Sequence, residues 1–176
     1  MGGRDGAVTQ LDQGGYQLAV PARAERSQES GEQGRLKGFL GLFGALKDGV
    51  LSAGIQERIA LAVAEFNGCS YCLSAHTMVS RNVAKLSDEE IEAARRGTSA
   101  DPKAAAVLRL ALAVAENRGR TGENAFAAAR DAGLTDEEIV ETIANTVRNV
   151  FTNYVNESLD VDVEWPLVTP FATTAR

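Results

Sequence analysis

The sequence has few of the side chains that most often carry chemistry. Its 176 residues include two cysteines, one histidine, one tryptophan and four prolines. A single Cys-x-x-Cys pair is more typical of a redox or metal site than of a structural disulfide framework. Scarce proline, combined with abundant alanine, favours helix.

Long apolar runs and an excess of positive charge are also missing. No run approaches the roughly 18 apolar residues that a membrane span needs, and the N-terminus carries no apolar signal core. We therefore expect a cytoplasmic protein with no membrane partner. The formal net charge is −6 and no basic stripe is present, so we expect no nucleic-acid partner either.

The length suits one domain with a sizeable core. No strand-length alternation recurs, so we predict an all-α fold, a single-domain helical bundle. Residues 1–35 are rich in Gly, Gln, Arg, Glu and Ser, and we expect a flexible or loosely docked N-terminal arm there. The helical domain is predicted over 36–166, followed by a C-terminal tail at 167–176.

An apolar helix is predicted from Leu36 to Val50. It contains Gly38, Gly41 and Gly44, whose spacing permits close helix approach, and we favour tight packing as the explanation. The alternative is that its large apolar side chains roof a substrate pocket or a subunit seam. These side chains are Leu40, Leu42, Phe43 and Leu46.

Four further helices are marked by their start and stop signals. Ser87–Glu90 and Thr135–Glu138 have the capping-box pattern, and Asp101 precedes a proline at the first helical position. Glycines end the first three of these helices. The predicted helices cover about 87–97, 101–119, 123–132 and 135–159.

The last of these helices has two contrasting faces. One face is apolar and is predicted to face the core, and the other carries a stripe of four asparagines. Because asparagine is a poor helix former, the stripe is unusual. We expect a solvated polar face, and the alternative is a hydrogen-bonded seam between subunits or beside the functional site. The apolar face comprises Ile139, Ile143, Val147, Val150 and Tyr154, and the stripe comprises Asn145, Asn149, Asn153 and Asn156.

Both cysteines and the histidine lie between positions 69 and 76, where a new helix is predicted to begin after Gly68. A helix N-terminus offers free N–H groups and a positive dipole end, which favour a thiolate. Cys72 and His76 are an i,i+4 pair, so the imidazole can exchange a proton with the thiol or stabilise its thiolate. In the preceding helical run, 55–67, the stretch Ile59–Ala64 is apolar all round, so this helix is predicted to be buried.

A third group usually orients the base in such a pair. Glu57, from the preceding helix, is the candidate, and Glu65 is its nearby rival. An exposed glutamate at a helix start is the simpler explanation of Glu57.

Together these residues form the motif Glu-x11-Cys-x-x-Cys-x3-His, made by Glu57, Cys69, Cys72 and His76. The motif resembles the signature of the alkylhydroperoxidase D (AhpD)-like proteins, which belong to the carboxymuconolactone decarboxylase superfamily. The words Glu-Arg-Ile-Ala-Leu before the motif and Asn-Val-Phe-Thr-Asn-Tyr near the end are similar too. The likeness runs from about residue 36 to 166.

The resemblance implies an enzyme that reduces hydroperoxides with thiols. Cys72 would attack the peroxide, Cys69 would resolve the product to a disulfide, and His76 and Glu57 would relay protons. At Tyr71 the sequence departs from the best-known members, which carry a second histidine there; its hydroxyl is a possible auxiliary group.

The resemblance also implies a homo-oligomer, commonly a trimer or hexamer. We expect no bound cofactor and no resident metal. No nucleotide-binding glycine fingerprint is present, so the electrons would come from another protein or a dithiol. The reductant would be an external dithiol, on a thioredoxin-like protein or a lipoyl group.

Other interpretations of the motif remain open. The cysteines could be small core residues, or the four motif side chains could ligate zinc. The dithiol could serve a disulfide reductase or redox relay without significant peroxidase activity. A lactone decarboxylase is less favoured because that chemistry has no evident use for two cysteines beside a histidine, and a packing module without activity is the last alternative.

Overall fold

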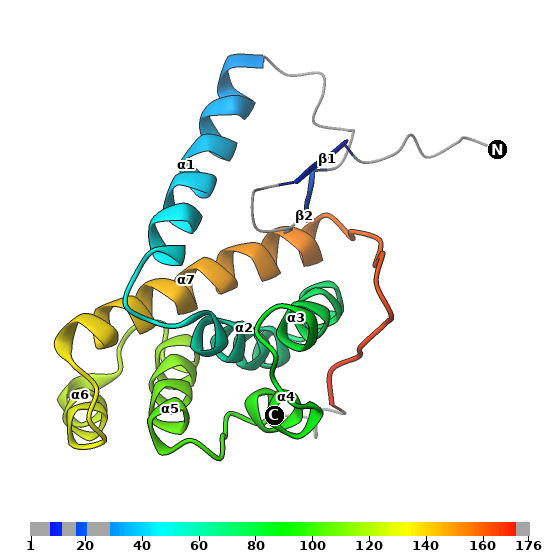
Figure 1. Cartoon of the computed structure of the whole chain (residues 1–176). Helices are drawn as coiled ribbons and strands as arrows, with labels where there is room; N and C mark the ends of the chain where they lie inside the picture. The colour runs from blue at the N-terminus through cyan, green and yellow to red at the C-terminus, as the bar shows by residue number, and fades with distance from the viewer. Residues whose placement is uncertain (1–7, 12–16, 21–28, 172–176) are drawn as a thin grey trace.

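The computed structural model describes residues 8–11, 17–20 and 29–171, and gives side-chain surroundings from residue 37 onward. Seven helices in this part of the chain confirm the predicted all-α fold (Figure 1). They are α1 (Glu29–Lys47), α2 (Ala53–Asn67), α3 (Ser70–Asn82), α4 (Asp88–Arg95), α5 (Pro102–Glu116), α6 (Gly122–Asp131) and α7 (Asp136–Ser158).

The N-terminal region differs from the prediction in two respects. Strands β1 (Val8–Leu11) and β2 (Gln17–Val20) pair antiparallel, with Val8 opposite Val20, and form a short hairpin that was not predicted. Helix α1 begins at Glu29, inside the predicted arm. The rest of the arm lies outside the described residues, so its flexibility stays a prediction.

Helix α2 is the centre of the bundle and packs against α3, α4, α5 and α7. Its run from Ile59 to Ala64 is buried on every side, as the continuous apolar sequence predicted. The main core joins Ile59 and Val63 of α2 to Val107 and Leu110 of α5 and to Ile139 of α7. This packing holds the end of α2, and therefore the start of α3, in a fixed place.

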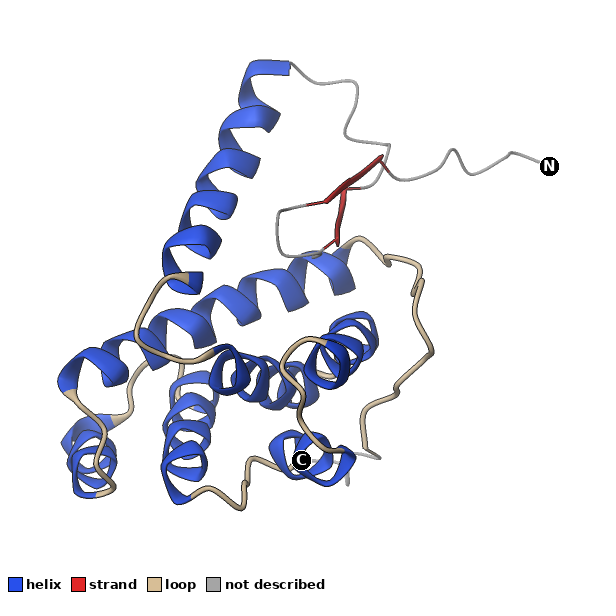
Figure 2. Cartoon of the chain, viewed as in Figure 1, coloured by secondary structure: helices blue, strands red, loops and turns tan. Residues whose placement is uncertain are grey.

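Helix α1 rises away from the bundle and contacts mainly α7 (Figure 2). A Cβ atom added at Gly38, Gly41 or Gly44 would meet nothing within 4 Å in the described part of the chain. The favoured explanation of these glycines, close packing, is therefore wrong within one copy of the chain.

The turn after α1 is held by a buried carboxylate of α7. Glu141 accepts hydrogen bonds from the backbone N–H groups of Val50, at 2.6 Å, and Leu51, at 3.1 Å. A Cβ atom on Gly49 would collide with the same carboxylate, so a larger residue at this position would displace Glu141 from its place at the turn. The contact fixes where α1 leaves the bundle.

The two predicted capping boxes have different outcomes. At Thr135 both reciprocal hydrogen bonds of the box are present. At Ser87 only the hydroxyl caps the helix, because the Glu90 carboxylate turns instead to Arg58, Ser99 and the backbone N–H of Ala100. Glu90 thus links α2 to the α4–α5 connection, a role that the local pattern does not reveal.

The prediction for the two faces of α7 is largely wrong. Val147 is 55% exposed and Tyr154 is 59% exposed, although both were assigned to the core face. The asparagine stripe, expected to be solvated, is buried at all four positions. The alternative explanation of the stripe, a hydrogen-bonded seam beside the site, is the one that the structure supports.

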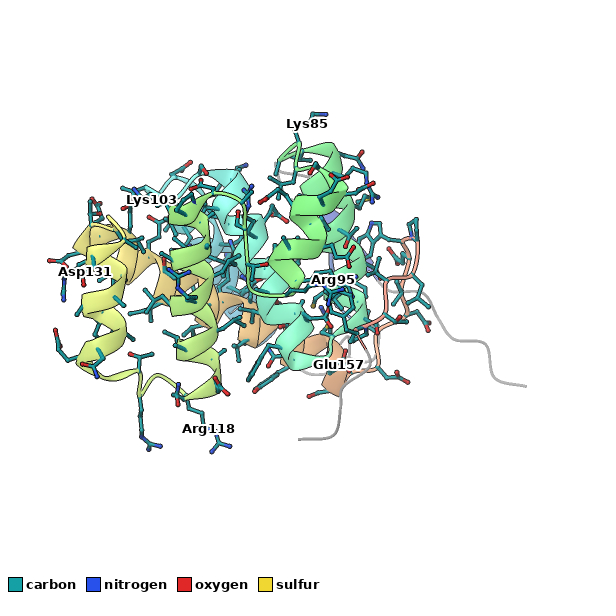
Figure 3. All side chains as sticks on the ribbon, turned by 90° about the horizontal axis from the view of Figure 1, so that it is seen from below. Lys85, Arg95, Lys103, Arg118, Asp131 and Glu157 are labelled. Atoms are coloured by element: carbon teal, nitrogen blue, oxygen red, sulfur yellow. The ribbon has the colours of Figure 1, made fainter. Side chains whose placement is uncertain are left out.

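The segment after α7 is irregular and runs back across the bundle. Val168 donates its N–H to the Ser74 hydroxyl of α3, at 2.9 Å. The Phe171 N–H binds Glu65, which also pairs with Arg95 of α4 (labelled in Figure 3). Residues 167–171 of the predicted tail therefore contact the helices that carry the site.

Candidate active site

The site is built where α2 ends and α3 begins. Gly68 ends α2 in the left-handed conformation, with φ of 73°, and its N–H bonds back to the last turn. Cys69 is the N-cap of α3, and its sulfur accepts the N–H of Cys72 at 3.4 Å. Both sulfurs consequently lie at the positive end of the α3 dipole, as predicted.

The two cysteines form an unequal pair. Both thiols are free and buried, and their Sγ atoms are 2.9 Å apart in a hydrogen bond. The hydrogen bond from Cys69 is the largest of the effects that lower the pKa of Cys72, from its ordinary 9.0 to about 6, against the opposing effect of burial. The same bond and burial raise the pKa of Cys69. The opposite directions of the two shifts favour Cys72 as the thiolate and Cys69 as the thiol that donates to it.

Asparagines of α7 complete the surroundings of the thiolate. Asn156 donates from Nδ2 to Cys72 Sγ at 3.3 Å, and this bond further lowers the pKa of Cys72. Asn153 also lowers it, and its side-chain oxygen accepts a hydrogen bond from Asn67 at 2.8 Å. Sequence reasoning did not place Asn156 in the site, although the asparagine stripe was the signal that could have found it.

His76 and Glu57 meet as the motif predicted. His76 Nδ1 lies 2.9 Å from Glu57 Oε2, and both side chains are buried. The contact of Nδ1 with the carboxylate fixes the orientation of the ring, and the electrostatic effect of His76 lowers the pKa of Cys72. The rival carboxylate, Glu65, is engaged with Arg95 and is not part of this arrangement.

A small cavity of about 50 Å³ adjoins the thiolate. Tyr71 contributes to its wall; burial is the main reason that the pKa of this tyrosine is raised to about 12. The Tyr71 hydroxyl is buried and has no hydrogen-bond partner among the described residues, while the ring packs edge-on against Trp165. The cavity is lined by Phe43 of α1, by Tyr71, Cys72, Ala75 and His76 of α3, and by Arg148, Asn149, Thr152 and Asn156 of α7.

The alternative of a zinc site finds no geometric support. Within the described residues, no three side chains of the metal-binding types are placed to hold one ion together. The Cys72 sulfur is hydrogen-bonded to Cys69 and Asn156, and His76 is paired with Glu57. The arrangement is that of a thiolate with its donors and a base with its orienting carboxylate.

Comparison with known proteins points to one family and one fold. Residues 36–117, which include all four motif residues, match the carboxymuconolactone decarboxylase family. A peroxidase-related protein with an AhpD core from Ralstonia eutropha is 27% identical, with a TM-score of 0.65 over 73% of this chain and 70% of its own. No curated protein gave a match.

Two further solved structures share the fold at lower identity. One is a protein of unknown function from Agrobacterium tumefaciens, suggested to be the antioxidant defence protein AhpD, at 21% identity and a TM-score of 0.69 over 82% of this chain and 97% of its own. The other is a variant of the debrominase Bmp8 bound to 2,3,4-tribromopyrrole, at 21% identity and a TM-score of 0.65 over 77% of this chain and 74% of its own.

Family match, fold and motif together make the chain similar to the AhpD-like proteins of the carboxymuconolactone decarboxylase superfamily. The names of the similar proteins span peroxidase-related, antioxidant and debrominating proteins. The likeness therefore establishes the scaffold. No helix among the described residues is long and apolar enough to cross a membrane.

Proposed function

We propose that the protein is a thiol-dependent hydroperoxide reductase in which Cys72 is the attacking nucleophile. The observation that carries the proposal is the unequal sulfur pair beside the cavity, with the lowered pKa of Cys72 and the raised pKa of Cys69. A nucleophilic thiolate next to a protonated resolving thiol is what two-step peroxide reduction needs.

In the first step the Cys72 thiolate attacks the terminal oxygen of the hydroperoxide. The S–O bond forms, the O–O bond breaks, and the alkoxide leaves with a proton. His76, held by Glu57, is the proposed proton donor to the leaving oxygen. The buried Tyr71 hydroxyl is an auxiliary donor to the same oxygens, since it lines the cavity.

In the second step Cys69 attacks the sulfur of the Cys72 sulfenic acid. The S–S bond forms, and water leaves with the proton of the Cys69 thiol. The disulfide then needs two electrons from an external dithiol. Because Cys72 is only 3% exposed, a slender dithiol such as a lipoyl group can reach it more easily than a dithiol on the surface of a folded protein.

Disulfide reduction or redox relay without peroxidase activity is the competing proposal, since the same dithiol would serve it. The burial of both sulfurs favours a small substrate over a protein disulfide, because thiol–disulfide exchange needs direct approach of sulfur to sulfur. A working dithiol also implies a reducing compartment, so we propose that the protein is cytoplasmic.

Assembly into a homo-oligomer is part of the proposal. Its support is the exposed apolar surface on α1 and α7, which includes Leu42, Val147 and Tyr154. Helix α1, open along its glycines, is a suitable element for a second copy to cover.

The proposed function is tested by following peroxide consumption with excess dithiothreitol as reductant. Cys72→Ser is expected to abolish turnover, since no nucleophile remains. In a separate assay without dithiothreitol, Cys69→Ser is expected to consume one peroxide per molecule, because Cys72 still attacks once and the sulfenic acid then has no thiol to reduce it. Undiminished turnover in Cys72→Ser would contradict the proposal. Reduction of small disulfides, but not of peroxides, by the native protein would favour the redox-relay alternative.

A further inference from the structure

One buried amide near the thiolate has its two ends in different situations. Asn153 of α7 is fully buried, and its side-chain oxygen accepts a hydrogen bond from Asn67 Nδ2 at 2.8 Å. Its own Nδ2 group has no hydrogen-bond partner among the described residues. Burying an amide N–H group without a partner has a free-energy cost, so such a group calls for an explanation from its surroundings.

The contacts of neighbouring residues place this group beside Cys72. Asn156, three residues further along α7 and therefore adjacent on the helix surface, donates to Cys72 Sγ at 3.3 Å. Asn67 ends α2, two residues before Cys69. Asn153 itself lowers the pKa of Cys72, although no hydrogen bond of ordinary geometry joins the two side chains. The unpaired N–H group is thus a donor that is directed toward the thiolate.

The orientation of the Asn153 amide decides whether it favours or opposes the thiolate. The oxygen and the NH₂ group of an asparagine have nearly the same size and shape, so packing alone does not distinguish them. With the oxygen toward the sulfur, the negative end of a dipole would face a negative charge. The hydrogen bond from Asn67 occupies the oxygen, and this leaves the donor end for the sulfur.

We propose that Asn67 is a positioning residue of the site, whose hydrogen bond fixes the Asn153 amide so that its donor end faces the Cys72 sulfur. Asn67 is not among the residues that line the cavity, so it acts through Asn153 and not on the substrate. Its contribution to peroxide reduction rests on the proposed function, whereas its effect on the thiolate does not.

The test is the rate of iodoacetamide alkylation of Cys72 from pH 5 to 9, a reaction in which the thiolate forms a C–S bond and iodide leaves. Asn67→Ala removes the hydrogen bond to the Asn153 oxygen, and the pKa of Cys72 is expected to rise by about half a unit. Alkylation at pH 5.5 should then slow by about two- to threefold, with little change at pH 9. Asn67→Asp is expected to have a larger effect, because a carboxylate only accepts hydrogen bonds and would turn the donor end of Asn153 away from the sulfur.

Other ionisable groups also face the two sulfurs or their neighbours, and these substitutions leave all of them in place. The groups are Cys69 with Glu157, His76 with Glu57, Tyr71 with Glu164, and Arg148 in the cavity wall. Because they are common to every variant, a change in the pH profile on Asn67→Ala reports the contact between Asn67 and Asn153.

A double-mutant cycle with Asn153→Leu shows whether Asn67 acts through Asn153. Asn67→Ala added to Asn153→Leu is expected to change the profile no further, because the amide that it positions is gone. In the same background Asn67→Asp should keep only the effect of its added charge. An unchanged profile in Asn67→Ala alone, or the same shift in both backgrounds, would overturn the proposal.

The matched control is Asn82→Ala, which removes an asparagine from the exposed last position of α3, as Asn67 is the last residue of α2. It is expected to keep the native profile. A shift in Asn82→Ala equal to that in Asn67→Ala would also overturn the proposal, because it would indicate a general effect of losing an amide at a helix end.

A second measurement uses the native protein alone, so it does not depend on whether a variant folds. In ¹H–¹⁵N NMR spectra, one Nδ2 proton of Asn153 is expected to move downfield as the pH rises, with the same midpoint as alkylation of Cys72. If neither proton follows that titration, the donor end does not face the sulfur and the proposal fails. A protein that meets these expectations but leaves peroxides intact would retain the role of Asn67 while the proposed function fails.

Discussion

At Cys72, the proposed reactivity depends on a thiolate that is stable at neutral pH. Cys69 and Asn156 donate hydrogen bonds to its sulfur, and His76 adds a favourable charge. Each of these interactions favours the ionised form, and burial opposes it. The balance lowers the pKa of Cys72 to about 6.

The first prediction concerns the pH dependence of alkylation. A cysteine with its ordinary pKa of 9.0 reacts slowly below pH 8, whereas Cys72 is expected to gain reactivity as the pH rises through about 6 and then reach a plateau. The sign follows because only the deprotonated form reacts. The measurement is the rate of iodoacetamide alkylation from pH 5 to 9 on the native protein, with mass spectrometry to distinguish the two cysteines. A Cys69→Ala variant is unsuitable because Cys69 itself supports the thiolate. A midpoint near 8.5 at Cys72 would contradict the assignment.

The second prediction concerns Asn156. Asn156→Leu removes the Nδ2 donor while keeping a side chain of similar size, so the pKa of Cys72 is expected to rise by about one unit. Alkylation at pH 6 should then slow severalfold, and alkylation at pH 9 should change little. Asn82→Leu, at the exposed end of α3, is the control and should leave the profile in place. An unshifted pH profile in Asn156→Leu would mean that Asn156 does not stabilise the Cys72 thiolate.

The third prediction concerns Tyr71. Tyr71→Phe removes a buried hydroxyl that has no partner among the described residues, so the free energy of unfolding should not fall. If the hydroxyl assists peroxide cleavage, the rate of Cys72 oxidation should fall while iodoacetamide alkylation stays the same. Equal oxidation rates in the variant and the native protein would assign Tyr71 to packing against Trp165 alone.

Among the elements, local patterns predicted α2 and the start of α3, whereas for α7 they predicted the bounds and the capping box but not which face is buried. The break at Gly68, the buried run of α2 and the start of α3 are determined by neighbouring residues, so local patterns predicted them. The burial of Asn153 and Asn156 depends on the distant cysteine helix, and helical periodicity carries no information about that contact. The pattern also gave no reason to place Arg148 at the site, because a single arginine on a helix is normally exposed.

The fourth prediction concerns the link between α1 and α7. Glu141→Ala leaves the N–H groups of Val50 and Leu51 without their acceptor, which should lower the free energy of unfolding by about 1–3 kcal/mol. Urea denaturation measures the change. Glu137→Ala, an exposed position on the same helix, should cost less than about 1 kcal/mol. Equal effects of the two substitutions would mean that the buried carboxylate does not hold the turn.

For the whole molecule, one copy of the chain exposes apolar surface on two of its helices. Helix α1 lies open along its glycines, and neighbouring positions of α7 expose Val147 and Tyr154. Burial of such side chains against a second copy would stabilise an assembly, since each large apolar group contributes roughly 1.5–3 kcal/mol when removed from water. Phe43 joins this region to the cavity, so assembly and the site share one helix.

The fifth prediction is therefore an oligomer that depends on this surface. Light scattering of the native protein should give a mass well above 18.6 kDa. Val147→Glu combined with Tyr154→Glu should shift the protein toward the single chain, whereas Val83→Glu, exposed at the end of α3, should not. A native protein that scatters as one chain would contradict the prediction directly.

The central claim is that Cys72 and Cys69 reduce a peroxide together. The most direct test is a thiol titration and an intact mass of the fully reduced protein, before and after one equivalent of cumene hydroperoxide. We expect the rapid loss of both thiols and a mass decrease equal to two hydrogen atoms, which defines a Cys69–Cys72 disulfide. Two thiols that persist in the presence of excess peroxide would contradict it.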